Sequence, residues 1–279
     1  MISSAVLRRP RVLMAGVGAL LLVVAAFSLP AVQGVAQEFL SIFRVKSIQP
    51  VAPPPPGIQP PVRPDEVITV IEKQEGQTKT FASVVEAAAA GFTLRTPARL
   101  PAGVSATPQV TVKEPSGMRF TADRQMAEAA LAAAGITGVV LDPRLDGAEF
   151  QINVPAMAVL AYSDRLTLTQ GRSPEVLGPS GLDYDKLRAQ ALSVLAAYAP
   201  DTAAQLGAIG GWRSTLPLPL PADTPRRAVT VDGVYGLVVE DGAGTPGHAV
   251  VMWQKDGVVY GLAGAFPAAE LLATANSLH

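Results

Sequence analysis

The chain has no cysteine and only two histidines among its 279 residues. The absence of cysteine excludes disulfide bonds, catalysis by a thiol, and membrane attachment through an acylated cysteine. One histidine, His248, is internal and the other, His279, is the last residue, so neither a structural zinc site nor a histidine-based catalytic triad is expected. The sequence therefore predicts no metal ligands and no cofactor.

Motifs for catalysis and for nucleotide binding are also missing. There is no Gly-x-Ser-x-Gly elbow, no phosphate-binding loop and no dinucleotide glycine motif. Carboxylates such as Glu149 and Glu240 show no spacing that favours a glycosidase pair. The formal net charge of −1 gives no basic field to attract nucleic acid. We therefore expect a non-enzymatic protein with no catalytic residues and no nucleic-acid partner.

One apolar run near the N-terminus is long enough to cross a membrane. Residues 12–29 contain no charged side chain, and three arginines stand just before them. A helix rises about 1.5 Å per residue, so this length matches the roughly 30 Å hydrocarbon core of a bilayer. Because positive charge accumulates on the cytoplasmic side, residues 1–11 are predicted to be a cytoplasmic tail and residues 12–33 a transmembrane signal-anchor helix. The rest of the chain is then extracytoplasmic, on a single-pass protein of the cell membrane.

A cleavable signal peptide is the main alternative interpretation of this run, and a buried helix of a soluble protein is the least favoured one. Such a peptide has a basic start, a shorter apolar stretch and an exit of small residues. Gly34-Val35-Ala36 fits such an exit, and cleavage there gives a mature chain that starts near Gln37. The length of the apolar run and its distance from Ala36 favour the uncleaved anchor.

Two connecting segments are expected between the span and the folded domain. Four apolar side chains between Phe39 and Phe43 fall at helical spacing and are followed by cations, which favours a juxtamembrane helix over residues 34–48. Packing of the same side chains onto the folded domain is the alternative. Residues 49–64 are rich in proline, which favours a stiff polyproline II stalk.

Residues 65–279 are expected to form one extracytoplasmic domain. Segments rich in β-branched and aromatic residues are interrupted by a few helical ones, without regular strand–helix–strand alternation. This pattern predicts an α+β fold with a curved, mainly antiparallel sheet and packed helices. A hairpin is expected between residues 108–112 and 118–120. Thr121 is predicted to cap the following helix, and Asp183 a later one.

Two Asp-Gly pairs in the last quarter of the chain predict tight hairpin turns. They are Asp232-Gly233 and Asp256-Gly257, and Asp-Gly suits the positive φ angles of a type I′ turn. A two-residue loop at the second pair places Trp253 opposite Tyr260. We therefore expect these two aromatic side chains to form a cross-strand pair on a buried face.

Two segments carry a resemblance to a known domain family. One is Gly91-Phe92-x-Leu94-x-x-Pro97-x-x-Leu100-Pro101-x-Gly103. The other is Trp253-Gln-Lys-Asp-Gly-Val-Val-Tyr260-Gly-Leu262, followed by Leu271-Leu-Ala-Thr-Ala-Asn-Ser-Leu278. They resemble the opening and the close of a bacterial extracytoplasmic domain of unknown function, which occurs in single-pass membrane proteins associated with anti-sigma factors and in lipoprotein-carrier-like proteins.

The resemblance implies a sensory or carrier role without known catalysis. Anti-sigma factors of this kind hold their sigma factor with a cytoplasmic helical domain. The roughly eleven residues before the span are too few to build one, so the chain would supply only the outer part of such a system.

Trp212 and Arg213 form the candidate binding surface. Trp212 follows Gly210-Gly211 in a predicted loop, next to a Pro-rich crossing, although packing of Trp212 in the core is the alternative. The leading hypothesis is a membrane-anchored sensing or binding module with a protein partner. The alternatives are a carrier of lipid or another hydrophobic ligand and, least favoured, an unrecognised hydrolase.

Overall fold

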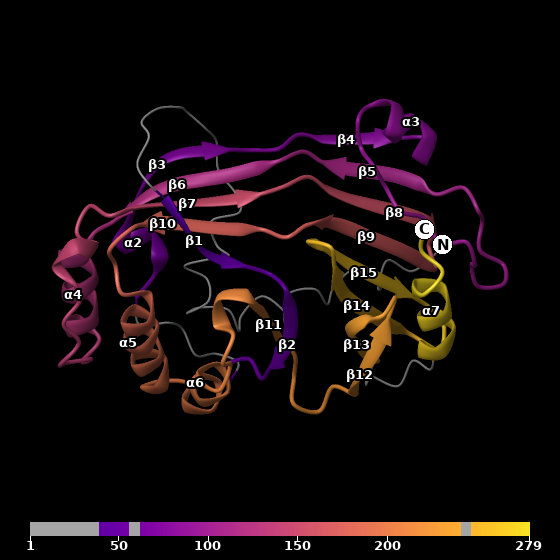
Figure 1. Cartoon of the computed structure of the whole chain (residues 1–279). Helices are drawn as coiled ribbons and strands as arrows, with labels where there is room; N and C mark the ends of the chain where they lie inside the picture. The colour runs from indigo at the N-terminus through magenta and orange to yellow at the C-terminus, as the bar shows by residue number, and fades with distance from the viewer. Residues whose placement is uncertain (1–38, 56–61, 241–246) are drawn as a thin grey trace, which may run out of the picture.

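The computed structural model describes residues 39–55, 62–240 and 247–279 (Figure 1). The predicted cytoplasmic tail and the predicted span, residues 1–11 and 12–33, lie outside these ranges. No helix within the described ranges has both the length and the apolar character needed to cross a bilayer. The described chain has an α+β fold with mainly antiparallel sheets.

Two antiparallel sheets form most of the molecule. In spatial order, the five-stranded sheet contains β1 (Phe39–Arg44), β10 (Glu175–Pro179), β7 (Glu149–Val154), β6 (Ser116–Ala122) and β3 (Ile68–Gln74). The eight-stranded sheet contains β12 (Arg226–Val231), β13 (Val234–Glu240), β14 (Ala249–Lys255), β15 (Val258–Gly264), β9 (Leu166–Arg172), β8 (Met157–Ser163), β5 (Gln109–Lys113) and β4 (Thr78–Phe81). A parallel pair joins β2 (Ser47–Val51) to β11 (Thr215–Pro219).

The two sheets share four long strands, each interrupted once. β3 continues into β4, β5 into β6, β7 into β8 and β9 into β10, which gives the arched layer in Figure 1. The interruptions contain Gly76, Pro115, Pro155 and Pro174, and they lie side by side because the strand residues that flank them are paired. Proline has no N–H to donate, and a Cβ at Gly76 would collide with the backbone of Glu114. The hydrogen-bond ladder therefore breaks along one line, and the layer bends there.

The hairpin predicted between residues 108–112 and 118–120 is wrong. β5 pairs with β4 and β8, whereas β6 pairs with β3 and β7 in the other sheet. Pro115 ends one ladder without reversing the chain, so the two runs are halves of one bent strand.

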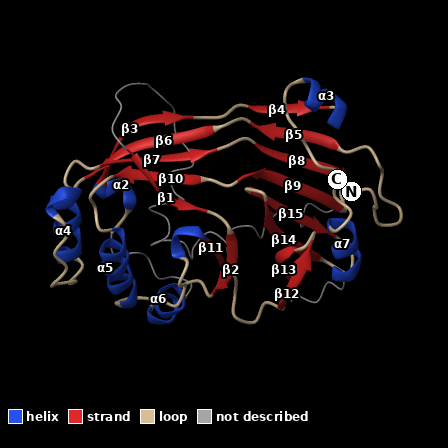
Figure 2. Ribbon diagram, in the orientation of Figure 1, coloured by secondary structure: helices blue, strands red, loops and turns tan. Residues whose placement is uncertain are grey.

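Most helices lie on one side of the arched layer. The helices of the described ranges are α2 (Pro64–Val67), α3 (Val84–Ala89), α4 (Arg124–Ala133), α5 (Tyr184–Ala196), α6 (Pro200–Gly207) and α7 (Ala268–Ala275), with short 3₁₀ turns η1 (Pro143–Leu145) and η2 (Trp212–Ser214). Figure 2 shows α4, α5 and α6 below one end of the arch and α7 below the other.

Carboxylates cap the two longest helices. The Asp183 side chain accepts a hydrogen bond from the Lys186 N–H at 2.9 Å, as the sequence predicts. The predicted cap at Thr121 is wrong, because this residue is still part of β6 and Asp123 accepts from the Met126 N–H instead. β6 extends two residues further than expected, so the cap moves by the same amount.

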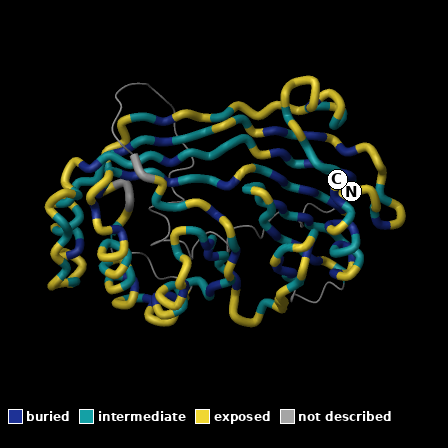
Figure 3. The backbone as a smooth tube through the Cα atoms, in the orientation of Figure 1, coloured by how far each residue is buried: buried dark blue, intermediate teal, exposed yellow. Residues whose placement is uncertain are grey.

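The largest hydrophobic core lies within the curl of the eight-stranded sheet. Buried residues alternate with more exposed ones along β8 and β9, as Figure 3 shows for the strands in general. The core includes Leu160, Leu168, Trp253 and Leu262 from the sheet, and Leu271 from α7. A helix that covers a curled sheet removes one face of every central strand from water, which is the main stabilising contribution in such a layer.

Residues 39–51, within the segment predicted as a juxtamembrane helix and a stalk, belong to the fold. β1 pairs with β10, and β2 pairs with β11. Val45, Ile48 and Val51 are buried, and β2 contacts β13, β14 and α6. Pro50 is tolerated because β2 has a strand neighbour on one side only, so its missing N–H breaks no ladder.

The predicted boundaries in this segment are therefore corrected. The helix over 34–48 is wrong where that range is described. The domain start at residue 65 is wrong because the fold already includes β1 and β2. The stalk is wrong over residues 49–51, which belong to β2, and residues 56–61 of it lie outside the described ranges. Four apolar side chains are too short a window to separate a helix from a strand, and the strands that pair with these residues lie more than 120 positions away.

Candidate functional site

Trp212 lies in η2 and is half-buried. Its ring packs against a small core that contains Ala148, Leu182 and Tyr184. Its indole N–H donates a hydrogen bond to Asp185 Oδ1 at 2.8 Å. The side chain is thus anchored at both its apolar and its polar side. Packing against a core, one of the two alternatives for Trp212, is therefore found, and a role in binding stays a proposal.

Arg213 lies beside Trp212 and shares its partner. Its guanidinium donates to Asp185 Oδ2 at 3.0 Å, and it stands 5.2 Å from the Trp212 ring centre and 5.8 Å from that of Tyr184. Nevertheless 47% of the Arg213 side chain and 71% of the Asp185 side chain remain exposed. An aromatic ring, a guanidinium and a carboxylate are therefore held in fixed relation at the surface.

The charge state of this cluster follows from its hydrogen bonds. The bond from the Trp212 indole, together with the nearby charges of Arg213 and Arg188, holds the pKa of Asp185 below its usual value. Burial raises the pKa of Tyr184 to about 12, so its hydroxyl stays protonated. That hydroxyl donates to the Pro179 carbonyl at 2.7 Å. At neutral pH the cluster therefore presents a carboxylate and guanidinium groups, with a neutral phenol beneath them.

Helix α5 positions the cluster. Asp183 caps its first turn, and Tyr184 and Asp185 follow directly. Tyr184 reaches over Gly178 of β10, where a Cβ would collide with the Tyr184 hydroxyl and the Phe150 ring. A glycine at this strand position is what lets the helix approach the sheet.

Arg188, one turn further along α5, is a part of the cluster that the sequence does not reveal. Its guanidinium lies 5.7 Å from the Trp212 ring centre and donates to the carbonyls of Leu206, Gly207 and Ile209, at 2.6, 3.3 and 3.2 Å. It thereby satisfies the open C-terminal end of α6. An arginine on the polar side of a predicted helix gives no sign of this contact, because its partners lie about 20 residues away.

The predicted C-terminal hairpin has the expected register. Trp253 pairs with Tyr260 across the turn at Asp256-Gly257, where both residues have positive φ angles. The two rings stack with centres 5.0 Å apart and planes 11° apart. Trp253 is only 1% exposed, so it is a core residue and does not belong to a surface site.

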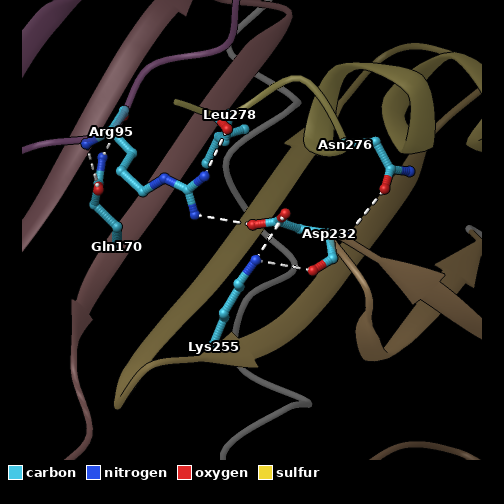
Figure 4. Close-up of polar contacts among 6 residues, drawn as sticks. All are labelled: Arg95, Gln170, Asp232, Lys255, Asn276 and Leu278. Carbon is cyan, nitrogen blue, oxygen red and sulfur yellow. Dashed lines mark hydrogen bonds and ion pairs between the residues drawn. The ribbon is translucent and has the colours of Figure 1, made fainter.

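A second polar cluster surrounds Asp232 (Figure 4). The Asp232 carboxylate pairs with Lys255 at 2.8 Å and with Arg95 at 3.0 Å, and its backbone N–H donates to the Asn276 side chain. Arg95 also donates to the Leu278 carbonyl at 2.6 Å. Hydrogen bonds from Lys255 and then Arg95 lower the pKa of Asp232. This cluster ties the end of the chain to the sheet, so we assign it a structural role.

The same region brings together the two segments that carry the family resemblance. Thr96 and His279 exchange backbone hydrogen bonds, and Pro97 forms a bridge with Leu278. Gln170 of β9 completes the contact, because its side chain both accepts from the Arg95 N–H and donates to the Arg95 carbonyl. Segments more than 170 positions apart in the sequence are thus neighbours in the fold.

Groups suited to metal binding do not gather in the part of the chain that the structure describes. There, no three His, Cys, Asp or Glu side chains are placed to hold one ion. His248 is exposed just before β14. The arrangement around Trp212 offers stacking, charge pairing and hydrogen bonding, which are the interactions of recognition.

The fold and the surface cluster together define an α+β protein that holds aromatic and charged side chains in fixed relation at its surface. Comparison of the chain with protein-family models, curated proteins and solved structures found no match.

Proposed function

We propose that the chain is a non-enzymatic, membrane-anchored extracytoplasmic binding or sensing module that uses Trp212 and Arg213 to bind a protein partner. The observation that carries the proposal is the placement of Arg213, whose guanidinium is held by Asp185 over two aromatic rings while nearly half of the side chain stays exposed. Trp and Arg are the residue types that dominate binding energy at protein interfaces.

Preorganisation is the physical reason why this surface suits binding. A free arginine side chain loses rotamer freedom when a partner fixes it, at a cost of about 0.5–1.5 kcal/mol. Arg213 is already restrained by its ion pair and by the two rings. Most of its rotamer freedom is therefore lost when the chain folds, and little more is lost when a partner binds. The family resemblance supports placing such a module in the outer part of an anti-sigma-type signalling system.

Site-specific photocrosslinking in membranes tests the proposal. A photoreactive amino acid at Ser214, next to Arg213 in η2, should give a discrete adduct with one membrane or extracytoplasmic protein. The same amino acid at Val85, which is 78% exposed on α3, is the matched control and should not give it. Trp212→Ala should weaken the adduct formed from a probe at Ser214.

Two results would contradict this function. The first is an identical crosslinking pattern from Ser214 and Val85. The second is turnover of esterase, glycosidase, peptidase or phosphatase substrates that co-purifies with the chain and is lost on changing one carboxylate or serine.

A hydrophobic-ligand carrier is the second candidate, and one observation favours it. Residues paired across neighbouring strands share a face of the sheet, and one such row runs through Lys73, Met118, Ile152, Val176 and Phe43. Lys73 is only 1% exposed, and its ammonium pairs with the Glu75 carboxylate at 2.8 Å. A buried cation at the end of an apolar row suits an amphiphile with an acidic head group.

Native mass spectrometry of the purified chain separates this candidate from the first. A carrier should retain a lipid, and Lys73→Met should lose an acidic one. Lys79→Met is the matched control, because Lys79 is half exposed and pairs with Glu114. Absence of any bound lipid, or equal retention by both variants, argues against the carrier.

A further inference from the structure

We infer that the end of the domain at which β1 begins lies against the membrane surface, held there by a short connection to the span. This inference rests on the proposed anchor. It concerns which surface of the domain the phospholipid headgroups contact, and it follows from where the first described strand enters the fold.

The connection is short because β1, the first described strand, comes before the predicted stalk in the sequence. The predicted span ends at residue 33 and β1 begins at Phe39, six residues later. A fully extended chain covers at most about 3.3–3.6 Å per residue, so these residues reach about 20 Å. A polyproline II stalk over residues 49–64 would have added about 50 Å, at about 3.1 Å per residue. Because β1 and β2 are paired within the sheets, the predicted stalk cannot hold the domain at that distance from the membrane.

The strand pairing identifies the end that is held. Phe39 pairs with Pro179, the last residue of β10. The loop that follows β10 contains exposed Ser180 and then Gly181, whose carbonyl accepts from the Arg144 guanidinium of η1. We call this the β1 end. The first residue of β1, the last residue of β10 and η1 are therefore neighbours there.

The opposite end of the arch is far from this point. From Pro179 back to Leu166, β10 and β9 form one long strand of fourteen residues, which at about 3.3 Å per residue extends roughly 40 Å. Figure 1 shows the loop before β5, residues 101–107, at the other end of the arch from α4. The two ends are thus separated by about twice the reach of the connection.

The charged side chains at the β1 end give little attraction to the membrane surface. We therefore attribute the contact with the headgroups to the short connection between the span and β1. At the β1 end, Arg144 pairs with Asp142 at 2.6 Å, and Arg124 pairs with Glu128 at 2.6 Å. Compensated pairs of this kind give little net attraction to acidic lipids. The contact should therefore form equally on neutral and acidic bilayers.

The absence of cysteine makes the test direct, because each single-cysteine variant carries one label. Ser180→Cys labels the β1 end, and Ala106→Cys labels the far loop; both positions are exposed. The labelled full chain is reconstituted in phosphatidylcholine vesicles that contain a headgroup spin-labelled lipid. We expect the fluorophore at residue 180 to be quenched several-fold more strongly than the one at residue 106. Equal or reversed quenching overturns the inference.

Two further measurements separate the inference from the proposed anchor. If the chain does not float with the vesicles, the anchor itself fails and the inference falls with it. If the chain floats, a flexible Gly-Ser insertion between Ala36 and Gln37 should reduce quenching at residue 180. Unchanged quenching in that variant would contradict a contact that depends on the short connection.

Discussion

Trp253 is one of the side chains that join the C-terminal hairpin to the core of the eight-stranded sheet. It is 1% exposed and stacks on Tyr260. We expect Trp253→Ala to lower the free energy of unfolding by about 3–5 kcal/mol, as for other buried large aromatics. Tyr235→Ala, on the neighbouring strand but 53% exposed, should change it by less than about 0.5 kcal/mol. Equal, small effects in urea denaturation would place Trp253 at the surface and reopen it as a binding residue.

Two buried tyrosines give a second test at the level of single residues. The Tyr162 hydroxyl has no hydrogen-bond partner within the described ranges, and burial raises its pKa to about 12. Tyr162→Phe removes an unsatisfied polar group, so we expect the free energy of unfolding to rise by about 1 kcal/mol. Tyr184→Phe should lower it by a similar amount, because the Tyr184 hydroxyl donates to Pro179. In thermal denaturation, the melting temperature should rise for Tyr162→Phe and fall for Tyr184→Phe. A shift of both melting temperatures in the same direction contradicts this account.

The Asp232 cluster predicts a pH dependence. Lys255 and Arg95 lower the folded-state pKa of Asp232, whereas the unfolded-state value is about 3.9. The stabilisation is therefore complete at neutral pH and is lost as the pH falls through the folded-state pKa. The difference in urea midpoint between the wild type and Asp232→Asn should shrink from about pH 6 to about pH 3. A difference that stays constant over this range would show that the charge of Asp232 is not involved.

Among the elements, β2 distinguishes the observed fold from the predicted stalk. Ile48 is buried in β2, and its neighbour Gln49 is exposed. Ile48→Asp should lower the free energy of unfolding by more than about 3 kcal/mol, because it buries an unpaired charge. Gln49→Asp should change it by less than about 0.5 kcal/mol. If both substitutions have the same small effect in denaturant titrations, residues 47–51 are not part of the folded core.

The elements that the sequence predicts well are those with a local cause. The Asp256-Gly257 turn fixes its own register, and Asp183 caps the helix that starts one residue later. β1 and β2 could not be predicted, because their partners β10 and β11 lie far along the chain. The bend at Pro115 also could not be predicted from the local sequence. A proline at the end of a strand is compatible both with a turn that reverses the chain and with a strand that continues, and only the neighbouring strands decide between them.

The candidate site was predictable only in part, for the same reason. Trp212 and Arg213 stand out as an aromatic and a cation after two glycines, but Asp185 and Arg188 lie about 25 residues earlier on a helix. What makes the surface a site is the approach of α5 to η2. The packing of α5 on β10 in turn depends on Gly178, where a Cβ would collide with the Tyr184 hydroxyl, and this role is visible only in the folded chain.

For the whole molecule, the structure changes how the domain relates to its proposed anchor. The first described strand begins at Phe39, and η2, which carries the candidate binding surface, contacts β1. The Trp212–Arg213 surface therefore belongs to the half of the arch that is nearer the proposed span. A partner that reaches this surface would have to be at the membrane as well, which suits signalling across it.

The measurement that tests the central claim most directly is alkaline carbonate washing of membranes that contain the full chain, followed by sequencing of its N-terminus. The anchor over residues 12–33 predicts that the protein stays in the membrane pellet with Met1 or Ile2 at its N-terminus. A soluble mature protein that starts near Gln37 would contradict the account. Such a chain would keep β1 and the whole fold, but it would have lost its connection to the membrane.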